Sequence, residues 1–283
     1  NLRIGRKRVE VVLSKKVIIM LIFLSFSLSL TGCWDKIEID ERGFVLGLGI
    51  DLHNPEEEEP LLATFVLANP PAVLGESDVY NILLVSPGKS AYSIMRRMGM
   101  RASKSLYFGH LRVAVLGEEL VKDPKLLREV FDALEKDPHI SRKVSLAVAQ
   151  GKAREAFEVQ PEIEPNVVEY IRSIFELGSE TNRAPLENLE SVFYHFHTKG
   201  DGIITRLIIG EKDLKAAGAA VFKNFEFVDY IGEEVNRGLM FLRDDAVRGG
   251  YEVNHGEITV PIEITDTKTK YSLVQEGDDI RII

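Results

Sequence analysis

Phe44-Val-Leu-Gly-Leu-Gly-Ile50 is a short apolar run that contains β-branched residues and a glycine at every second position near its end. Such runs favour a β-strand. Side chains alternate across a strand, so Gly47 and Gly49 lie on the same face. A face without side chains allows another backbone to approach closely. We therefore predict a strand over residues 44–50 with one face open to close packing.

Further apolar runs alternate with helical patterns along the first two thirds of the chain. The runs at 61–67, 80–85, 111–116 and 144–149 are predicted strands. Residues 90–103 and 124–136 have apolar residues at helical spacing, and the second of these helices starts after Asp123, a good cap. Residues 165–177 predict another helix that ends at Gly178 in a left-handed cap.

A polar stretch after Gly178 indicates a loop or boundary, and a second unit is expected to start near Gly200. Its predicted strands cover 217–222, 225–231, 257–264 and 271–274, with a helix opening after Gly232. We predict an α+β fold with mixed sheets and flanking helices in at least two domains, 33–200 and 201–283. The second of these is expected to be truncated.

The first 32 residues have the layout of an export signal. Six basic residues precede an apolar run at 17–30, which is 14 residues long and shorter than the roughly 20 that span a bilayer. The run ends in Leu30-Thr-Gly-Cys33, which resembles a lipobox. Cys33 is the only cysteine of the chain, and the alternative is a small buried apolar residue. We predict a signal peptide over 1–32 and lipid on Cys33.

Charge limits the choice of partners. Removal of residues 1–32 changes the formal net charge from −9 to −14, which argues against nucleic acid as a partner. From Val79 to Gly117 there is no acidic residue, and a basic segment there includes Arg96, Arg97, Arg101 and Lys104. It is a candidate contact for lipid headgroups or an acidic partner. The alternative is a solvated helix face that acids elsewhere balance.

Several stretches resemble one known family. Gly32-Cys-Trp-Asp-Lys-Ile-Glu-Ile-Asp-Glu-Arg42, followed by Gly47-Leu-Gly-Ile-Asp51, is similar to the opening of the Ger(x)C lipoproteins, the C-subunits of spore germination receptors. The segments 106–119, 136–140 and 162–170 continue the resemblance, and the block from Gly218 to Leu239 is its most recognisable part. Family members usually continue well past the length of this chain.

The resemblance implies a lipid-anchored, non-enzymatic subunit on the outer face of the inner spore membrane. It would act in assembly or signalling of a nutrient germinant receptor beside the integral-membrane A and B subunits. The turn and helix at 232–238, with Glu233 and Glu234, then become a second candidate contact surface. Two alternatives stay open: a lipid-anchored solute-binding protein and a surface hydrolase.

Enzyme-like motifs are incomplete in this sequence. Residues 47–52 lack the third glycine of a dinucleotide loop, and Pro87-Gly-Lys-Ser90 lacks the earlier glycine of a phosphate loop. His195 and His197 would point the same way on a strand but have no obvious third metal ligand. His110 has no acid or nucleophile partner in sequence, and Asp244-Asp245 is typical of an exposed turn. We therefore expect no catalytic, cofactor or metal site.

Overall fold

The computed structural model describes residues 15–23, 38–245, 249–256, 258–276 and 279–282. The chain divides into two compact units, Asn1–Glu41 and Arg42–Ile283. In the first, residues 15–23 form an exposed helix and Ile39–Glu41 form a 3-10 turn (η1). Cys33 lies outside the described residues, so its lipidation stays a prediction. None of the helices described has both the length and the apolar character to cross a bilayer.

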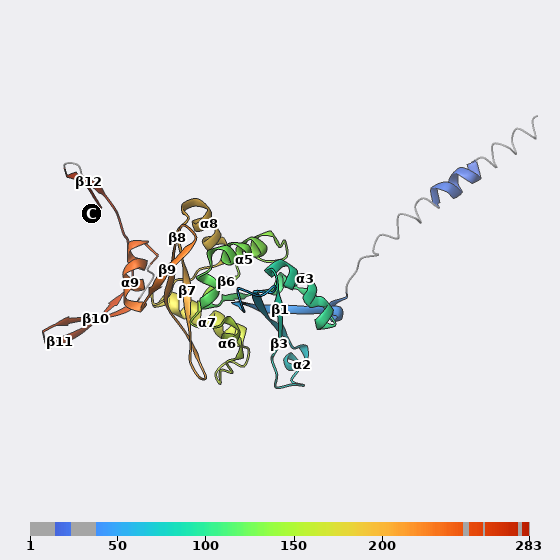
Figure 1. The fold of residues 1–283 in the computed structure, drawn as a ribbon, viewed down its shortest axis with the longest axis horizontal. Helices are drawn as coiled ribbons and strands as arrows, with labels where there is room; N and C mark the ends of the chain where they lie inside the picture. The colour runs from blue at the N-terminus through green and yellow to red at the C-terminus, as the bar shows by residue number, and fades with distance from the viewer. Residues whose placement is uncertain (1–14, 24–37, 246–248, 257, 277–278, 283) are drawn as a thin grey trace, which may run out of the picture. The chain divides into compact units, whose positions relative to one another are not determined.

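In the second unit, nine of the described strands form one mixed sheet in the order β3-β2-β1-β5-β6-β7-β8-β9, with β4 paired to the start of β1 (Figure 1). The strands are β1 (Arg42–Leu52), β2 (Leu61–Ala68), β3 (Asn81–Gly88), β4 (Ser105–Tyr107), β5 (Val113–Leu116), β6 (Ser145–Ala149), β7 (Gly202–Ile209), β8 (Leu214–Lys223) and β9 (Glu226–Ile231). β1, β5, β6 and β7 are parallel neighbours, and the other pairs of the main path are antiparallel.

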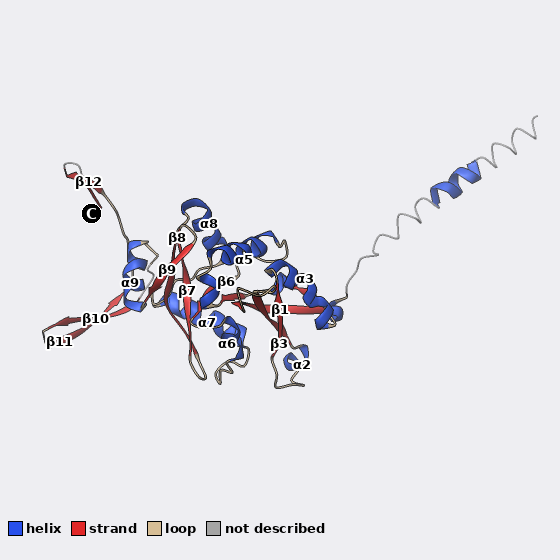
Figure 2. Cartoon of the chain, in the orientation of Figure 1, coloured by secondary structure: helices blue, strands red, loops and turns tan. Residues whose placement is uncertain are grey.

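Helices connect these strands, and two antiparallel hairpins follow the sheet (Figure 2). The helices are α2 (Pro70–Val73), α3 (Ala91–Ala102), η2 (Phe108–His110), α4 (Glu118–Val121), α5 (Pro124–Lys136), α6 (Ala153–Glu158), α7 (Val167–Glu180), α8 (Leu189–Lys199) and α9 (Glu233–Leu242). The hairpins are β10 (Gly249–His255) with β11 (Ile258–Ile264), and β12 (Leu273–Glu276) with β13 (Asp279–Ile282). The predicted α+β class is confirmed.

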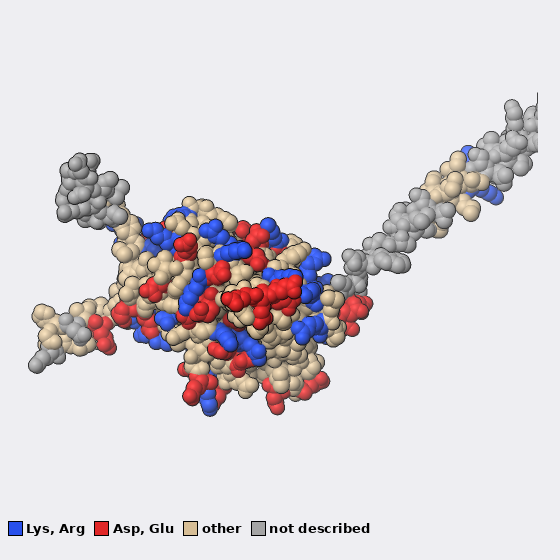
Figure 3. Space-filling view, in the orientation of Figure 1, with Lys and Arg blue, Asp and Glu red and all other residues tan. Residues whose placement is uncertain are grey.

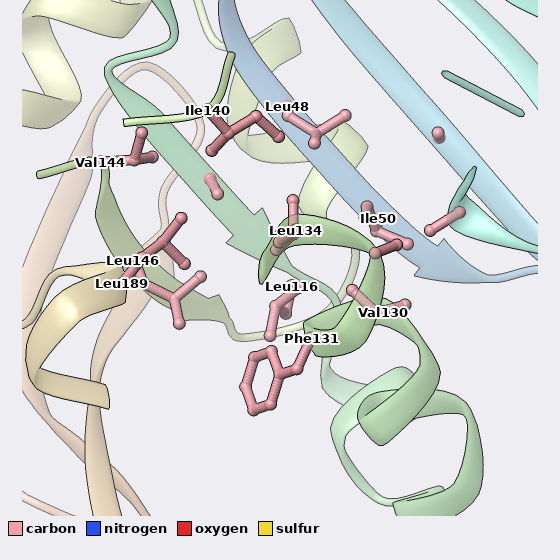
Figure 4. Close-up of a cluster of buried hydrophobic side chains, with 14 of the residues drawn as sticks. Leu48, Ile50, Leu116, Val130, Phe131, Leu134, Ile140, Val144, Leu146 and Leu189 are labelled. Carbon is pink, nitrogen blue, oxygen red and sulfur yellow. The ribbon is translucent and has the colours of Figure 1, made fainter. Parts of the chain in front are cut away.

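Two apolar clusters hold the helices on opposite faces of the sheet. Side chains of α3, α4, α5 and α8 form one cluster with β1, β5 and β6, and those of α6 and α7 form the other. Figure 4 shows the centre of the first, where Leu48 of β1, Leu116 of β5 and Phe131 of α5 converge. α5 supplies its face as the sequence predicted, and the side chain of Asp123 caps it by accepting from the backbone N–H groups of Lys125 and Leu126.

The predicted open face of β1 receives the ring of Phe157 from α6. A Cβ atom on Gly47 would lie 2.9 Å from one edge carbon of this ring, and one on Gly49 would lie 3.2 Å from another. Both distances are shorter than ordinary van der Waals contact. The two glycines therefore let α6 sit directly on β1, which confirms the interpretation made from their spacing.

Two predictions about residues 178–200 are wrong. Gly178 lies within α7, which continues to Glu180, and a Cβ atom there would approach the Cβ of Ala216 to 3.3 Å, so this glycine serves helix–sheet packing. His195 and His197 lie on α8 and not on a strand. Asn188 caps α8, and Leu189, Val192, Phe193 and Phe196 have the helical spacing that we did not recognise.

The predicted domain boundary at residue 200 falls between α8 and β7. β7, β8 and β9 extend the sheet that β1–β6 begin, so the sheet is continuous across this position. The predicted antiparallel character of the later strands is confirmed by the pairs β7–β8, β8–β9, β10–β11 and β12–β13. The division into domains 33–200 and 201–283 stays a prediction.

A buried carboxylate joins the end of β1 to the start of α6. Asp51 is 2% exposed, and its two oxygens accept from the backbone N–H groups of Ala153 at 2.6 Å and Arg154 at 3.0 Å. Burial raises the pKa of Asp51 above its ordinary value of 3.8, although both hydrogen bonds act in the opposite direction. Gly117 leaves room for this carboxylate, because a Cβ atom there would lie 2.1 Å from Oδ1.

We expect Asp51→Ala to lower the free energy of unfolding by about 2–3 kcal/mol, because it leaves two N–H groups of α6 without their acceptor. Gly117→Ala should also destabilise the chain, because its methyl group displaces the carboxylate. In urea unfolding of both single variants and the double variant, Gly117→Ala should cost clearly less when Asp51 is already alanine. Additive effects of the two substitutions would contradict this account.

Candidate protein-contact surfaces

The basic segment of the sequence forms α3 and the turn after it. Ser90 begins the helix: its hydroxyl accepts from the N–H of Ser93 at 3.1 Å, and the hydroxyl of Ser93 accepts from the N–H of Ser90 at 3.3 Å. Ile94 and Met98 face the core, which leaves the charged positions toward solvent. The predicted contact residues Arg96, Arg97, Arg101 and Lys104 are all exposed.

Acidic residues of the loop between β1 and β2 lie against this segment. Glu59 forms an ion pair with Arg97 at 3.1 Å, and Glu58 pairs with Lys89. The hydrogen bond from Lys89 lowers the pKa of Glu58. Figure 3 shows the same mixing of both signs of charge over the visible face. The alternative of a basic face balanced within the fold therefore holds for Arg97.

Arg101 also has a contact inside the chain. Its Nη1 lies 3.4 Å from the carbonyl oxygen of Val85 and 3.3 Å from the hydroxyl of Ser86, both on β3. β3 is an edge strand of the described sheet, so this guanidinium covers part of its open side. Arg97 and Arg101 thus contribute to the fold, and their role as partner contacts stays a prediction.

The outer α3 face is a stripe of Tyr92, Arg96 and Met100, four residues apart. Tyr92 is 53% exposed and Met100 is 81% exposed. Arg96 donates to the hydroxyl of Tyr92 at 2.9 Å, and its guanidinium lies 5.6 Å from the centre of the tyrosine ring. Tyrosine, methionine and arginine are enriched in protein interfaces. Our reading of the sequence noted only the charge and missed Tyr92 and Met100, although their spacing was visible.

The second predicted surface begins at Glu233, the first residue of α9. Its Oε2 accepts from Arg183 at 2.8 Å, and its Oε1 accepts from Lys215 of β8. The hydrogen bond from Lys215, followed by the contact with Arg183, lowers the pKa of Glu233. Glu234, in contrast, is exposed and pairs only loosely with Arg237 at 3.3 Å. Glu233 therefore fastens α9 to the sheet, and Glu234 is the more available of the two carboxylates.

Two other residues of this block also fix α9. Gly218 has a φ of +73° in β8, and a Cβ atom there would lie 2.0 Å from the carbonyl oxygen of Ile231. Asn236 is fully buried and donates to the carbonyl oxygen of Asn182 at 3.1 Å. In the most recognisable block of the family resemblance, from Gly218 to Leu239, several residues therefore serve to hold α9 in place.

The residues of the enzyme-like motifs make contacts that stabilise the fold. Gly88 ends β3, where a Cβ atom would lie 2.3 Å from Ile94, and Ser90 is the cap of α3. Asp244 accepts from the N–H of Thr269 at 2.6 Å, and Asp245 pairs with Arg243 at 2.8 Å.

The three histidines that the sequence singled out have different neighbours. His197 pairs with Glu135 at 3.0 Å, and Nε2 of His195 lies 3.5 Å from Arg243. The ring of His110 packs edge-on against Phe44 and Tyr107, at 5.2 Å and 5.6 Å between ring centres. In the part of the chain that the structure describes, no three His, Cys, Asp or Glu side chains are grouped to hold a metal ion.

Comparison with known proteins gives consistent matches along the chain. A family model described as "Spore germination protein N-terminal domain" matches residues 35–209, and one described as "Spore germination B3/ GerAC like, C-terminal" matches residues 217–283. Spore germination protein A3 of Bacillus subtilis (strain 168) is 24% identical over 92% of this chain and 72% of its own length.

Two further matches come from the same group. Spore germination protein KC of Bacillus subtilis (strain 168) is 27% identical over 48% of this chain and 34% of its own length. The crystal structure of the GerBC protein superposes with a TM-score of 0.51 at 18% identity, and covers 83% of this chain and 68% of that one. This likeness shows a shared fold.

We expect Glu233→Gln to lower the free energy of unfolding by about 1 kcal/mol at pH 7, since it removes two partly exposed ion pairs and an acid at a helix start. Because the pKa of Glu233 is lowered by folding, its ionised carboxylate stabilises the fold fully at pH values above 4.5. This stabilisation is lost as the pH falls through the pKa of the folded state. The difference between wild type and variant, measured by urea unfolding at several pH values, should therefore shrink below pH 4.5. Glu234→Gln is the matched control and should change little; equal effects would contradict the distinction.

Proposed function

The chain belongs to the GerAC family of spore germination proteins, and from this we propose that it is the lipid-anchored C-subunit of a nutrient germinant receptor. The observation that carries the proposal is the pair of family matches, which follow one another from residue 35 to 283. The subunit would act by binding to other receptor subunits, in assembly or signalling, and not by catalysis.

The contacts of the polar residues support a binding role. Among the described residues, polar side chains considered for catalysis make structural contacts: Asp244 accepts from the N–H of Thr269, and Nε2 of His197 lies 3.0 Å from Glu135. A surface hydrolase would need a nucleophile held beside a base. A solute-binding protein would need two similar lobes around a cleft, whereas β1–β9 form one sheet. Both alternatives are less well supported than a docking subunit.

The proposal of membrane attachment is based on the sequence that precedes the folded unit. Leu30-Thr-Gly-Cys33 follows an apolar run directly, as the lipid-modified cysteine of a lipoprotein does. Each buried methylene contributes about 0.8 kcal/mol, so one acyl chain binds marginally and two or three bind lastingly. We propose that diacylglycerol on Cys33 holds the chain on the outer face of the inner spore membrane, beside the integral-membrane A and B subunits.

The outer α3 face is the surface that we propose for contact with these subunits. Its residue types suit an interface, and it carries no acidic residue. Arg96 contacts Tyr92 of the same helix, so among the described residues it can turn to a partner without breaking a contact to another element. Lys104 follows Ser103, the C-cap of the helix, and extends the basic surface.

We expect Cys33→Ala, expressed in an endospore-forming bacterium, to leave the membrane fraction and to lack the mass of diacylglycerol that the wild type carries. The reason is that the thioether through which lipid attaches needs the cysteine sulfur. Intact-mass analysis of both proteins and fractionation of the cells measure this. A wild-type protein of unlipidated mass would remove the anchor from the proposal.

We expect the double variant Tyr92→Ser with Arg96→Glu to reduce co-purification of integral-membrane receptor subunits at least tenfold, because it removes an aromatic contact and reverses a charge on the outer α3 face. Lys212→Glu is the matched control: it makes the same charge change in an exposed loop, where Lys212 pairs with Glu162 at 3.1 Å. Urea unfolding should be alike for all three proteins. If the double variant still co-purifies with the receptor subunits, α3 is not the contact. If the lipidated wild-type protein co-purifies with no receptor subunit, the receptor role itself is refuted.

A further inference from the structure

An apolar groove lies between α8 and α9, over the strands β7–β9. Its cavity volume is about 930 Å³. Ile203 and Val221 are part of the strand floor, while Val235, Leu239 and Leu242 of α9 form one wall. These α9 residues follow the i, i+4, i+7 spacing of a helix face that packs against another helix. The groove is separate from the outer α3 face.

The chain leaves much of this apolar surface to solvent. Val235 is 61% exposed, Leu242 is 59% exposed and Val228 on β9 is 57% exposed. A neighbouring side of α9 is covered, since Asn236 and Met240 are buried. α9 therefore has one side that packs within the described chain and a second, apolar side that is largely exposed.

Gly238 lies in the same wall of the groove, in the middle of α9. A Cβ atom there would meet nothing within 4 Å, so the described chain itself does not require glycine. Glycine inside a helix makes the helix less stable than alanine does. Small residues at such positions let a second backbone come close, as they do where helices cross. The position therefore points to an element from outside that packs on α9.

The rim of the groove is mainly basic. Lys199 at the end of α8 and Lys223 at the end of β8 are exposed. Arg243 contributes a third cation, although it also pairs with Glu187 at 3.2 Å and Asp245 at 2.8 Å. Asp201 is an acid in the same lining, and it accepts from the N–H of Asn224 at 3.1 Å. The rim suits an occupant with acidic flanks.

We propose that the groove between α8 and α9 seats an amphipathic helix of a partner polypeptide, with its apolar side on Val235, Leu239 and Leu242 and acidic residues beside Lys199 and Lys223. Two helices already bound the groove above a strand floor, so a third helix completes the layer. A lipid surface fits less well, because these apolar residues line a recess between α8 and α9. The proposal rests on the proposed function only in taking that polypeptide to be a receptor subunit.

The first test compares stability with partner capture. Gly238→Ala in the full chain should raise the urea midpoint, since alanine favours the helix, and Gly238→Leu should reduce co-purification of the receptor subunits at least tenfold by blocking close approach. Lys212→Glu, in an exposed loop outside the groove lining, should leave capture unchanged. Undiminished capture by Gly238→Leu, with wild-type unfolding behaviour, would overturn the proposal.

The second test identifies the occupant. A photoreactive benzoyl-phenylalanine at Leu242 in the full chain, irradiated in spores, should crosslink to a helical segment of another polypeptide that carries apolar and acidic residues. Peptide mass spectrometry locates the adduct. Adducts to lipid, to a second copy of this chain or to another part of the same chain would each overturn the proposal, as would no adduct at all. Receptor subunits that still co-purify in those cases would leave the proposed function standing.

Discussion

The carboxylate of Asp51 holds together two parts of the chain that lie 102 residues apart in sequence. It lies next to the last residue of the strand that carries Gly47 and Gly49. It also supplies the acceptor at the start of the helix whose Phe157 fills the space above those glycines. One short stretch therefore provides both the flat surface and the hydrogen bonds that seat α6. That junction adds hydrogen bonds to the apolar packing of α6 on the second face of β1.

The sequence predicted the elements whose pattern is local. Residues 44–50 and 124–136 show strand and helix spacing directly, and Asp123 marks the start of α5. α8 was not predicted because the alternate spacing of His195 and His197 also fits a strand, although Asn188 and the apolar residues after it have the pattern of a capped helix. The continuity of the sheet past residue 200 depends on the pairing of β6 with β7, which no local pattern contains.

The candidate surfaces were predictable to a smaller extent. The charge pattern alone located α3. It did not show that Arg97 pairs with Glu59 or that Arg101 contacts the edge strand β3, because these partners are not neighbours of the two arginines in sequence. Glu233 looked like an exposed acid at a helix start, yet Lys215 and Arg183 enclose it. The groove beside α9 is formed by β7, β8, β9 and two helices, so only the folded chain reveals that Gly238 lines it.

The path of the chain into the sheet has a mechanical consequence. β1 is paired along its length, with β2 on one side and β4 and β5 on the other. Tension applied to the residues before Arg42 acts along an inner strand, so the hydrogen bonds on both sides carry the load together. Tension on an edge strand such as β9 would open its bonds one after another. A tether at the amino end, as we propose through Cys33, would load this inner strand, and its movement would be passed to the strands on both sides.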